Sequence, residues 1–328
     1  MDYAPLPGAL PHRLPSLRAP LRVAFVGQST FFRACALEGD AEGLHGTFVE
    51  HRGGADPGAL IGALEALEPH VVVVFRPEIV PAGLFAGLRA TTVGFLTEPL
   101  PRRGDSHPDL ERRLRELGSV DAGNFDRIVS FDPLIAETAD RVLPVWRSLP
   151  LPVADRYFRD VEPLTGSPRV VFIGRSTEHR EKMLTPAKHQ FDILHLAFGV
   201  DADMLERTLA EHDVGINLHN EPYPSFENRV ALHLAAGHLV LSEPLSPSHG
   251  LEPAIDYLVV TGAGDLVAAI DALRRYPGVY HRVRVRGRRK AEGFRASRVY
   301  PRLVRDLLAD VATFGSARAP RRSAVPSA

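Results

Sequence analysis

The residues that could do chemistry concentrate in one short polar segment of this chain, residues 219–229. The segment reads HNEPYPSFENR and directly follows an apolar run at 214–218. The apolar run predicts a buried strand, and the apolar periodicity at the end of the segment predicts a helix that Gly237 closes. Polar groups at the carboxyl end of a strand can converge on hydroxyl groups of a ligand, and a helix N-terminus offers amide donors to an anion. We therefore expect this loop to bind a phosphate-bearing ligand.

The first and last side chains of the segment have different predicted roles. His219, Asn220 and Glu221 directly follow the strand and are expected to contact hydroxyl groups. Arg229 lies near the start of the helix, where a cation gains nothing from the helix dipole. It therefore indicates either a diphosphate ligand or an ion pair with a neighbouring glutamate.

Ser225 is predicted to be the N-cap of this helix, which would place Glu227 and Asn228 in the first turn. For Glu227, a favourable interaction with the helix dipole is as reasonable as a ligand contact, whereas Asn228 is assigned to the ligand. His233 and His238 belong to the helix and its exit, and core or capping roles are predicted for them.

A second polar segment follows the apolar run 169–174, which ends in a glycine. Basic residues there could stabilise a departing diphosphate without the help of a metal ion. The alternative is a solvated basic loop. The polar and basic side chains of this segment are Arg175, Ser176, Thr177, His179, Arg180 and Lys182. We favour Arg180 and Lys182 as phosphate ligands.

Two further loops carry candidate residues. Glu98 lies near the end of a strand predicted at 91–99, so a catalytic base could come from here, although ordinary surface-loop chemistry is the alternative. The loop 246–252 contains His249 and Gly250. The glycine would let the backbone approach a ligand closely, and a plain connecting turn is the alternative.

Composition limits the class of protein. Of the 328 residues, 45% are hydrophobic and 24% are charged, with a formal net charge of -1, which is typical of globular chains. The single cysteine, Cys35, excludes an internal disulfide and a cysteine-cluster zinc site and favours a cytoplasmic location. No apolar run is long enough for a membrane span, and the overall charge does not favour nucleic acid as a partner.

Apolar runs of strand length alternate with helical patterns along the chain, which predicts α/β domains with parallel sheets. The alternation begins again at residue 169, after a proline-rich stretch at 142–168 that resembles a linker. The predicted fold is therefore two Rossmann-like βαβ domains that face a cleft. The predicted ranges are an extended arm at 1–20, an N-terminal domain at 21–155, a C-terminal domain at 156–315 and a disordered tail at 316–328.

Short motifs exclude several other classes. The first strand of each domain is followed by one glycine, Gly27 or Gly174, so neither matches the G-x-G-x-x-G pattern of dinucleotide binding, and no P-loop occurs. A nicotinamide enzyme is therefore disfavoured. Asp201 and Asp203 form an Asp-x-Asp triplet, but they precede a helical pattern, so N-capping is preferred to metal binding. No metal site and no cofactor are predicted.

The segment 217–243, NLHNEPYPSFENRVALHLAAGHLVLSE, resembles the nucleotide-sugar domain of GT-B glycosyltransferases, particularly the bacterial spore-maturation type. TTVGFLTEPLP, FDRIVSFDPLIA and SLPLPVADRYF are similar to the same family more loosely, so the resemblance covers roughly residues 91–310. In that family a polar loop precedes an arginine, an acidic residue, and small residues with a glycine. Arg229 and Gly237 fall at the arginine and glycine positions, and Leu232 occupies the acidic one.

The resemblance implies a metal-independent glycosyltransferase. The C-terminal domain would bind a nucleoside-diphosphate sugar, and the N-terminal domain would hold a glycan, lipid or small-molecule acceptor. Two alternatives remain open: an inactive GT-B-like scaffold, which the leucine at the acidic position favours, and a sugar-nucleotide epimerase on the same fold. The catalytic residues implied are Glu98, His219 and Glu221. The donor-binding residues implied are Arg175, Arg180, Lys182, Asn220, Ser225, Phe226, Glu227, Asn228, Arg229, His249 and Gly250.

Overall fold

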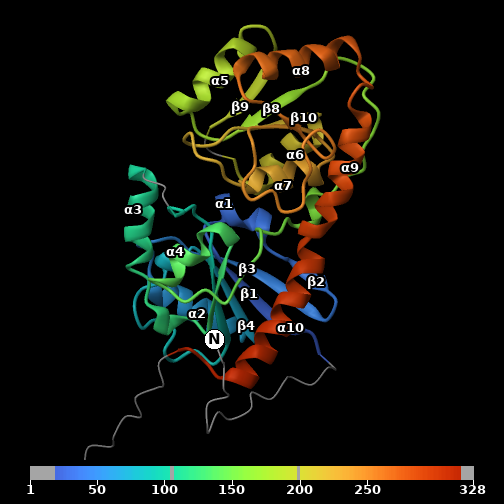
Figure 1. Ribbon diagram of the computed structural model, residues 1–328. Helices are drawn as coiled ribbons and strands as arrows, with labels where there is room; N and C mark the ends of the chain where they lie inside the picture. The colour runs from blue at the N-terminus through green and yellow to red at the C-terminus, as the bar shows by residue number, and fades with distance from the viewer. Residues whose placement is uncertain (1–18, 104–106, 198–199, 319–328) are drawn as a thin grey trace, which may run out of the picture. The chain divides into compact units, whose positions relative to one another are not determined.

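The computed structural model describes residues 19–103, 107–197 and 200–318. The chain divides into two compact units: unit 1 is Met1–Leu149 with Ser297–Ala328, and unit 2 is Pro150–Ala296. Each unit is built on its own sheet of parallel strands, with one antiparallel pair in unit 1, and helices pack against the sheet (Figure 1). The predicted α/β class with two Rossmann-like domains is therefore confirmed. None of the helices in the described ranges combines the length and the hydropathy of a membrane span.

Unit 1 contains a seven-stranded sheet with the order β2-β3-β1-β4-β5-β6-β7. The β2–β3 pair is antiparallel and the other pairs are parallel. The strands are β1 (Leu21–Gly27), β2 (Gly39–Ala41), β3 (Leu44–Glu50), β4 (Val71–Phe75), β5 (Thr91–Leu96), β6 (Arg127–Ser130) and β7 (Arg147–Ser148). The helices are α1 (Ser29–Phe32), α2 (Pro57–Leu67), α3 (Pro108–Leu117), α4 (Ala136–Asp140) and α10 (Ala296–Phe314).

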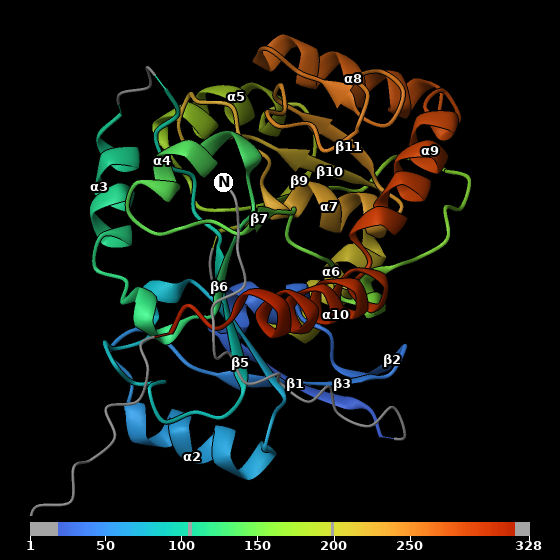
Figure 2. The same ribbon diagram turned by 60° about the horizontal axis from the view of Figure 1, so that its bottom comes forward.

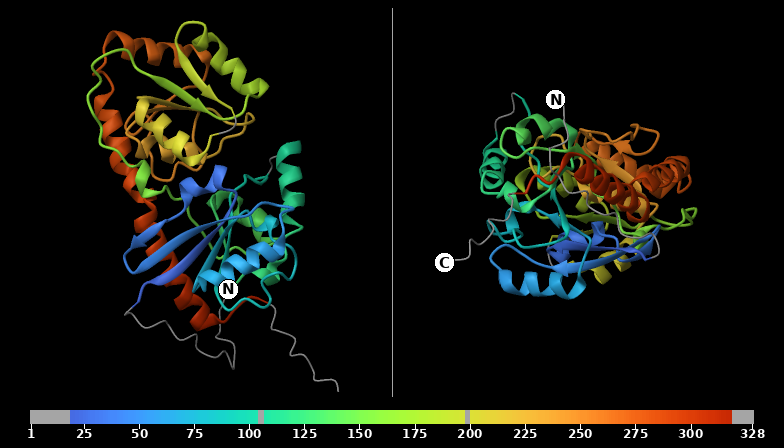
Figure 3. Two further views of the ribbon diagram at one scale, coloured as in Figure 1. Left: turned by 180° about the vertical axis from the view of Figure 1, so that it is seen from behind. Right: turned by 90° about the horizontal axis from the view of Figure 1, so that it is seen from below.

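The central strands β4 and β5 are buried throughout because helices cover both faces of the sheet. Every residue of β4 is buried. Helix α2 lies on one face and α10 on the other (Figures 2 and 3). Helix α2 begins as predicted, since the Asp56 carboxylate accepts hydrogen bonds from the amides of Gly58 and Ala59, and Pro57 is the first helical residue.

The last helix, α10, packs in unit 1 from Ser297 on, whereas the predicted ranges placed it in the C-terminal domain. The Tyr300 hydroxyl donates a hydrogen bond to the Cys35 carbonyl at 2.6 Å, and Leu307 on the apolar face is fully buried. An amphipathic pattern shows which face of a helix is apolar and not which sheet covers it. The sequence therefore predicts this helix but not its place.

Unit 2 contains a five-stranded sheet with the order β12-β11-β10-β8-β9, and all of its pairs are parallel. The strands are β8 (Val170–Ile173), β9 (Ile193–Leu196), β10 (Val214–Asn217), β11 (Leu239–Ser242) and β12 (Leu258–Val259). The helices are α5 (Glu178–Lys188), α6 (Ala202–Glu211), α7 (Asn228–Ala235), α8 (Ala263–Arg275) and α9 (His281–Ala291).

The helices of unit 2 also cover both faces of their sheet. Helices α5 and α8 pack side by side on one face, and their apolar residues form one core with alternate residues of β8, β10 and β11. Helices α6 and α7 lie on the opposite face (Figure 1). Helix α7 ends as predicted at Gly237, whose φ of 77° is the left-handed conformation that glycine adopts without strain.

Helix α5 and strand β9 were not predicted, and α5 occupies the place of the predicted basic loop. The helix is well capped, because the Thr177 hydroxyl accepts from the Arg180 amide and Glu178 and Glu181 lie in the first turn. Helix α5 contains Pro186 and many polar residues, so its apolar residues show only a weak helical periodicity. Strand β9 is a short, partly buried edge strand.

The proline-rich stretch at 142–168, predicted as a linker, contains the boundary between the units at Leu149 and Pro150. Beyond the boundary the chain packs into unit 2. Tyr157 is fully buried, and Val153 forms a bridge with Arg295.

Most of the predicted arm at 1–20 lies outside the described residues. The predicted tail at 316–328 is described only as far as Arg318, and this first part is held on unit 1. Ser316 donates to the Asp126 carboxylate, and the Arg318 guanidinium donates to the same carboxylate at 3.2 Å.

Replacing the buried Leu307 with alanine should destabilise unit 1 by about 2–5 kcal/mol, because the substitution opens a cavity between α10 and its sheet. Urea unfolding followed by limited proteolysis would show which unit opens first. Arg302→Ala, at an exposed position of the same helix, should change the free energy of unfolding by no more than about 0.5 kcal/mol. Preferential opening of unit 2 by Leu307→Ala would contradict the assignment of α10.

Candidate functional site

The candidate site lies at the carboxyl edge of the sheet in unit 2. Strands β8 and β10 are neighbours although β9 lies between them in the chain, so the chain order reverses there. Ligands of α/β sheets bind at such a reversal. The loops after β8 and β10 meet at this point through the hydrogen bonds described below. Both polar segments that the sequence singled out are therefore brought together.

Arg180 joins the two loops. Its side chain is 3% exposed. Its Nε donates to the carbonyls of Leu218 at 3.1 Å and His219 at 3.0 Å, and its Nη1 donates to the Arg175 carbonyl at 3.0 Å. A planar guanidinium can satisfy several carbonyls at once, which an ammonium group cannot do in the same geometry. The residue predicted as a phosphate ligand thus holds the loops after β8 and β10 together.

Arg229 lies beside Arg180 at the start of α7. Its Nη1 donates to Asn217 Oδ1 at 3.3 Å and to the Leu218 carbonyl at 3.0 Å. The Glu227 carboxylate accepts from Nη2 of both arginines, at 2.5 Å from Arg229 and 3.4 Å from Arg180. Of the two interpretations of Arg229, the ion pair with a neighbouring glutamate is present in the structure.

The two guanidinium groups repel each other in a buried environment. Their Cζ atoms lie 5.5 and 5.7 Å from the centroid of the Phe172 ring. Burial, followed by the charge of Arg229, lowers the pKa of Arg180 to about 10, although Glu227 opposes this shift. Arg180 therefore remains protonated at neutral pH, and an anion beside the arginine pair is stabilising.

A second network lies at the carboxyl end of β11. Glu243 accepts from the His219 amide at 2.6 Å and from His179 Nε2 at 2.8 Å. His219 Nε2 donates to the Pro244 carbonyl at 3.0 Å, and its Nδ1 accepts from the Ser225 hydroxyl at 3.2 Å. Burial lowers the pKa of His219, although Glu243 opposes the shift. The ring is neutral with both nitrogens engaged, so it positions the loop.

Arg175 and Asn220 lie at the more exposed edge of the same site. Arg175 Nε donates to Asn220 Oδ1 at 2.9 Å, and the Thr177 hydroxyl donates to the Asn220 carbonyl at 2.8 Å. Glu221, the next residue, is partly exposed. These polar groups can be reached from solvent, unlike the guanidinium of Arg180.

Two predicted positions differ in the structure. Lys182 is exposed on α5, two residues after the buried Arg180, so the two side chains point to different sides of the helix. Ser225 is not the N-cap of α7, because the helix begins at Asn228 and Glu227 occupies the cap position. Ser225 instead anchors the loop.

The aromatic and glycine candidates lie next to the loop. Phe226 is buried, and its ring meets the His249 ring edge-on with centroids 4.6 Å apart. Gly250 has a φ of 81°, and its carbonyl accepts from Lys290 Nζ at 2.8 Å. Phe226 and His249 therefore form an apolar wall beside the loop.

Glu98 belongs to unit 1 and follows β5. Its carboxylate pairs with Arg113 of α3 at 2.7 Å, and Arg113 also pairs with Asp109 at 3.1 Å. The carboxylate is therefore held by a cation at the carboxyl edge of the sheet in unit 1.

Sequence reasoning missed three members of the site in unit 2: Asn217, Glu243 and Phe172. Two of them, Asn217 and Glu243, have a recognisable position in the sequence. Asn217 is the polar residue within an apolar strand, and Glu243 is the first residue after β11. Phe172 looked like an ordinary core residue.

Two fully buried histidines, His233 of α7 and His238 just after it, pack between this helix, α6 and the sheet. His238 Nε2 donates to the Leu209 carbonyl at 2.8 Å, so its Nδ1 carries no proton in the neutral ring and accepts from His233 Nδ1 at 3.0 Å. His233 packs over Gly215, where an added Cβ would lie 2.2 Å from the ring. Burial lowers the pKa of His238 to about 4 and that of His233 well below its ordinary value. The predicted core role of this pair matches the structure.

The Asp-x-Asp triplet starts a helix, as predicted. The Asp201 carboxylate accepts from the Met204 amide at 2.7 Å, and Asp203 lies in the first turn of α6. Among the residues that the structure describes, no three histidine, cysteine, aspartate or glutamate side chains are grouped so that they could hold a metal ion.

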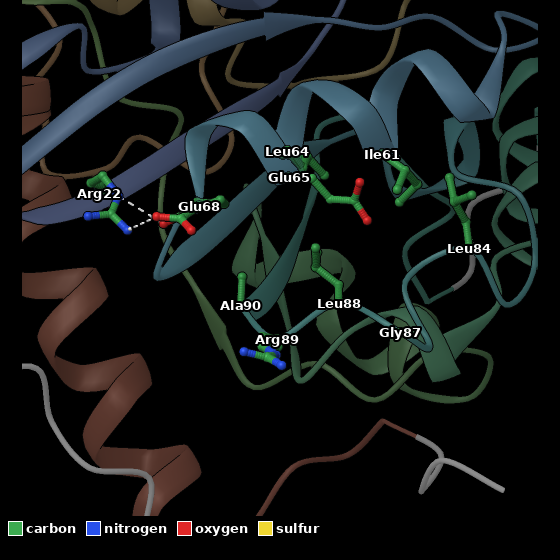
Figure 4. Close-up of a pocket in the computed structure, with 11 residues that line it drawn as sticks. Arg22, Ile61, Leu64, Glu65, Glu68, Leu84, Gly87, Leu88, Arg89 and Ala90 are labelled. Atoms are coloured by element: carbon green, nitrogen blue, oxygen red, sulfur yellow. Dashed lines mark hydrogen bonds and ion pairs between the residues drawn. The ribbon is translucent and has the colours of Figure 1, made fainter. Parts of the chain in front are cut away.

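A cavity of about 530 Å³ lies in unit 1 between α2 and the segment before β5 (Figure 4). Ile61 and Leu88 line it, and Glu65 points into it, while Arg22 pairs with Glu68 at its rim. Arg22 lies at the start of β1, so the cavity is at the amino edge of the sheet. Ligands of such sheets bind at the opposite edge, so we do not assign the cavity to the candidate site.

No family model matches this sequence, and no curated protein matches it. Several solved structures share its fold over most of the chain. The Anabaena protein Alr3699/HepE in complex with UDP-glucose is 10% identical, with a TM-score of 0.56 over 88% of this chain and 100% of that one. An alpha-glucosyltransferase in complex with UDP-glucose and DNA containing an abasic site is 12% identical, with a TM-score of 0.52 over 89% and 100%. A glycosyltransferase from Rickettsia africae ESF-5 is 11% identical, with a TM-score of 0.52 over 88% and 99%.

Similarity at this level of identity shows the fold alone. The structural neighbours include glycosyltransferases, and the two-domain GT-B-like fold that the sequence predicted is confirmed. The narrower resemblance to the spore-maturation type stays a prediction.

Arg180→Lys should lower the free energy of unfolding by about 2 kcal/mol, because an ammonium group cannot donate to the carbonyls of both loops and leaves buried acceptors unpaired. Chemical denaturation monitored by circular dichroism would measure the loss. Lys182→Gln, on the exposed side of the same helix, should change stability by no more than about 0.5 kcal/mol. Equal effects of the two substitutions would contradict the structural role of Arg180.

Acidification from about pH 7 to about pH 5 should destabilise unit 2 through His238, whose proton binds more readily in the unfolded chain. The pKa of this ring is about 4 in the folded state against an ordinary value of 6.5. The unfolded state therefore binds more protons in this window, and each such group lowers the free energy of unfolding by up to about 1.4 kcal/mol per pH unit.

Urea unfolding of wild type and His238→Gln across this window would isolate the contribution. The glutamine keeps a donor for the Leu209 carbonyl but does not titrate, so its pH dependence should be shallower by about one proton. Gln190→Ala, at an exposed position that does not titrate, should retain the wild-type slope. Identical slopes for wild type and His238→Gln would refute the assignment.

Proposed function

We propose that this protein is a glycosyltransferase that takes its sugar from a nucleoside-diphosphate sugar bound by unit 2. The observation that carries the proposal is the pair of guanidinium groups, Arg180 and Arg229, at the point where the strand order of unit 2 reverses. Two cations at this edge suit the two charged groups of a diphosphate. The fold shared with a protein in complex with UDP-glucose supports this donor class.

The residues of the site divide the proposed binding between them. Arg229 and the exposed Arg175 contact the diphosphate, while Asn220 and Glu221 contact hydroxyl groups of the nucleotide sugar. Arg180 holds the two loops in register through Nε and Nη1, which leaves its Nη2 to face the diphosphate. His219 positions the loop in the same way.

Transfer would depend on orientation of the donor and on cationic stabilisation of the departing diphosphate, without a metal ion. The acceptor, a glycan, lipid or small molecule, would belong to unit 1. Glu98 is the proposed base of that unit, since it follows the carboxyl end of β5, and its pairing with Arg113 keeps the carboxylate oriented.

One observation favours a second function, a GT-B-like protein that binds a nucleotide sugar without transferring it. Leu232, which stands at the acidic position of the resembling family, is buried in α7 and 8% exposed. A buried leucine cannot replace a carboxylate that grips a ribose. Binding of a nucleotide sugar without its consumption would identify this second function.

A thermal-shift screen against UDP, GDP, dTDP, ADP and their sugar conjugates tests the proposal. A ligand at about 100 times its Kd stabilises the folded chain by about 2.7 kcal/mol, so one base should raise the melting temperature clearly. Release of the nucleoside diphosphate from the matching sugar conjugate would then report turnover.

Arg229→Ala should abolish the shift, because it removes a cation that contacts the diphosphate. Unlike Arg180, Arg229 does not hold the two loops together, so the substitution leaves the loops in place. Arg207→Ala, an exposed arginine of α6, is the matched control and should respond to the ligand like wild type. A screen without any shift, or a shift that survives Arg229→Ala, would overturn the proposed donor site.

A further inference from the structure

The carboxylate of Glu227 occupies the position beside the arginine pair at which a diphosphate would have to bind. Backbone carbonyls take Nε and Nη1 of Arg180, and Nη1 of Arg229 donates to Asn217 and to a carbonyl. The other terminal nitrogen of each arginine, Nη2, faces Glu227. The donors that point out of the loops are therefore the ones that the carboxylate already binds.

Solvent exposure increases from Arg180 through Arg229 to Glu227. Arg180 is 3% exposed, Arg229 is 13% exposed and Glu227 is 25% exposed. The carboxylate is thus the member of this group that solvent reaches most easily. An anion that approaches the site meets the negative charge of Glu227 before it reaches the guanidinium groups.

The local structure shows that this contact is not a by-product of helix capping. Glu227 occupies the N-cap position of α7, where an acidic side chain commonly bonds to the first amides of the helix. Its side chain makes no such bond. It turns instead toward the arginine pair, whose mutual repulsion it relieves, consistent with its effect on the pKa of Arg180.

We propose that Glu227 is an internal competitor of the diphosphate: it neutralises the arginine pair in the ligand-free chain and leaves when a diphosphate takes its place. This inference rests on the proposed function of the same site. Its consequence is selectivity by charge. A ligand must replace the interactions of a carboxylate and withstand its repulsion, so diphosphates are selected over neutral sugars and over phosphate monoesters.

Isothermal titration of Glu227→Gln with UDP and, separately, with inorganic pyrophosphate tests the proposal. Glutamine preserves the size of the side chain and removes its charge, so both ligands should bind at least about tenfold more tightly than to wild type. Glu227→Asp keeps the charge on a shorter stem and should fall between the two. Glu211→Gln, at an exposed position of α6, changes the net charge equally and should alter affinity less than about twofold.

The melting temperature of each variant gives a second readout. Without its shared anion the arginine pair is repulsive, so Glu227→Gln should melt below wild type, and pyrophosphate should raise its melting temperature by more than that of wild type. Unchanged or weaker binding of pyrophosphate by Glu227→Gln would overturn the inference, as would failure of pyrophosphate to bind any variant.

The two proposals fail in different ways. If pyrophosphate binds Glu227→Gln more tightly than wild type but no nucleotide binds any variant, the proposed role of Glu227 as a competitor is supported and the glycosyltransferase proposal fails. If UDP binds wild type through Arg229 and Glu227→Gln weakens that binding, Glu227 is a ligand group, and the donor site stands while the competitor fails.

Discussion

The buried guanidinium of Arg180 is the interaction on which the site of unit 2 depends. At the edge where β8 and β10 lie side by side, two loops leave their strands, and their carbonyl groups point toward the Arg180 side chain. One planar side chain satisfies carbonyls from both loops. The same arrangement fixes a positive charge at this edge, because the guanidinium that makes these hydrogen bonds is also charged. Arg229 and Glu227 are arranged around that charge.

In the candidate site of unit 2, the neutral histidines and the charged side chains lie in different positions. The imidazoles of His219, His233 and His238 are held neutral by burial. His219 bonds to Ser225 and Pro244, whereas His233 and His238 bond to each other and to the Leu209 carbonyl. The ionic groups of the candidate site, Arg180, Arg229 and Glu227, lie near the ends of the strands, where a ligand can compete for them. This separation leaves the core insensitive to the ligand and confines changes of charge to a few side chains near the start of α7.

The sequence predicted the buried central strands, because buried parallel strands are continuous apolar runs, and it predicted helices such as α2, which carries a complete set of starting signals. It also located the loop after β10. It did not predict that Arg180 lies in a helix, since Pro186 and a polar composition conceal α5. Whether an arginine faces a ligand or a carbonyl depends on which strands become neighbours, and the order of strands is a property of the whole sheet. The roles of Arg180 and Glu243 could not be predicted for that reason.

The division of unit 1 into two stretches of chain has a consequence for the order in which the protein folds during its synthesis. Unit 2 is continuous, from Pro150 to Ala296, whereas unit 1 needs α10 to cover one face of its sheet. A ribosome therefore releases every residue of unit 2 before it releases the helix that completes unit 1. Domains fold as units when their residues are available, so the N-terminal sheet must wait with an apolar face exposed. The part of the chain that is made first is therefore the part whose fold is completed last.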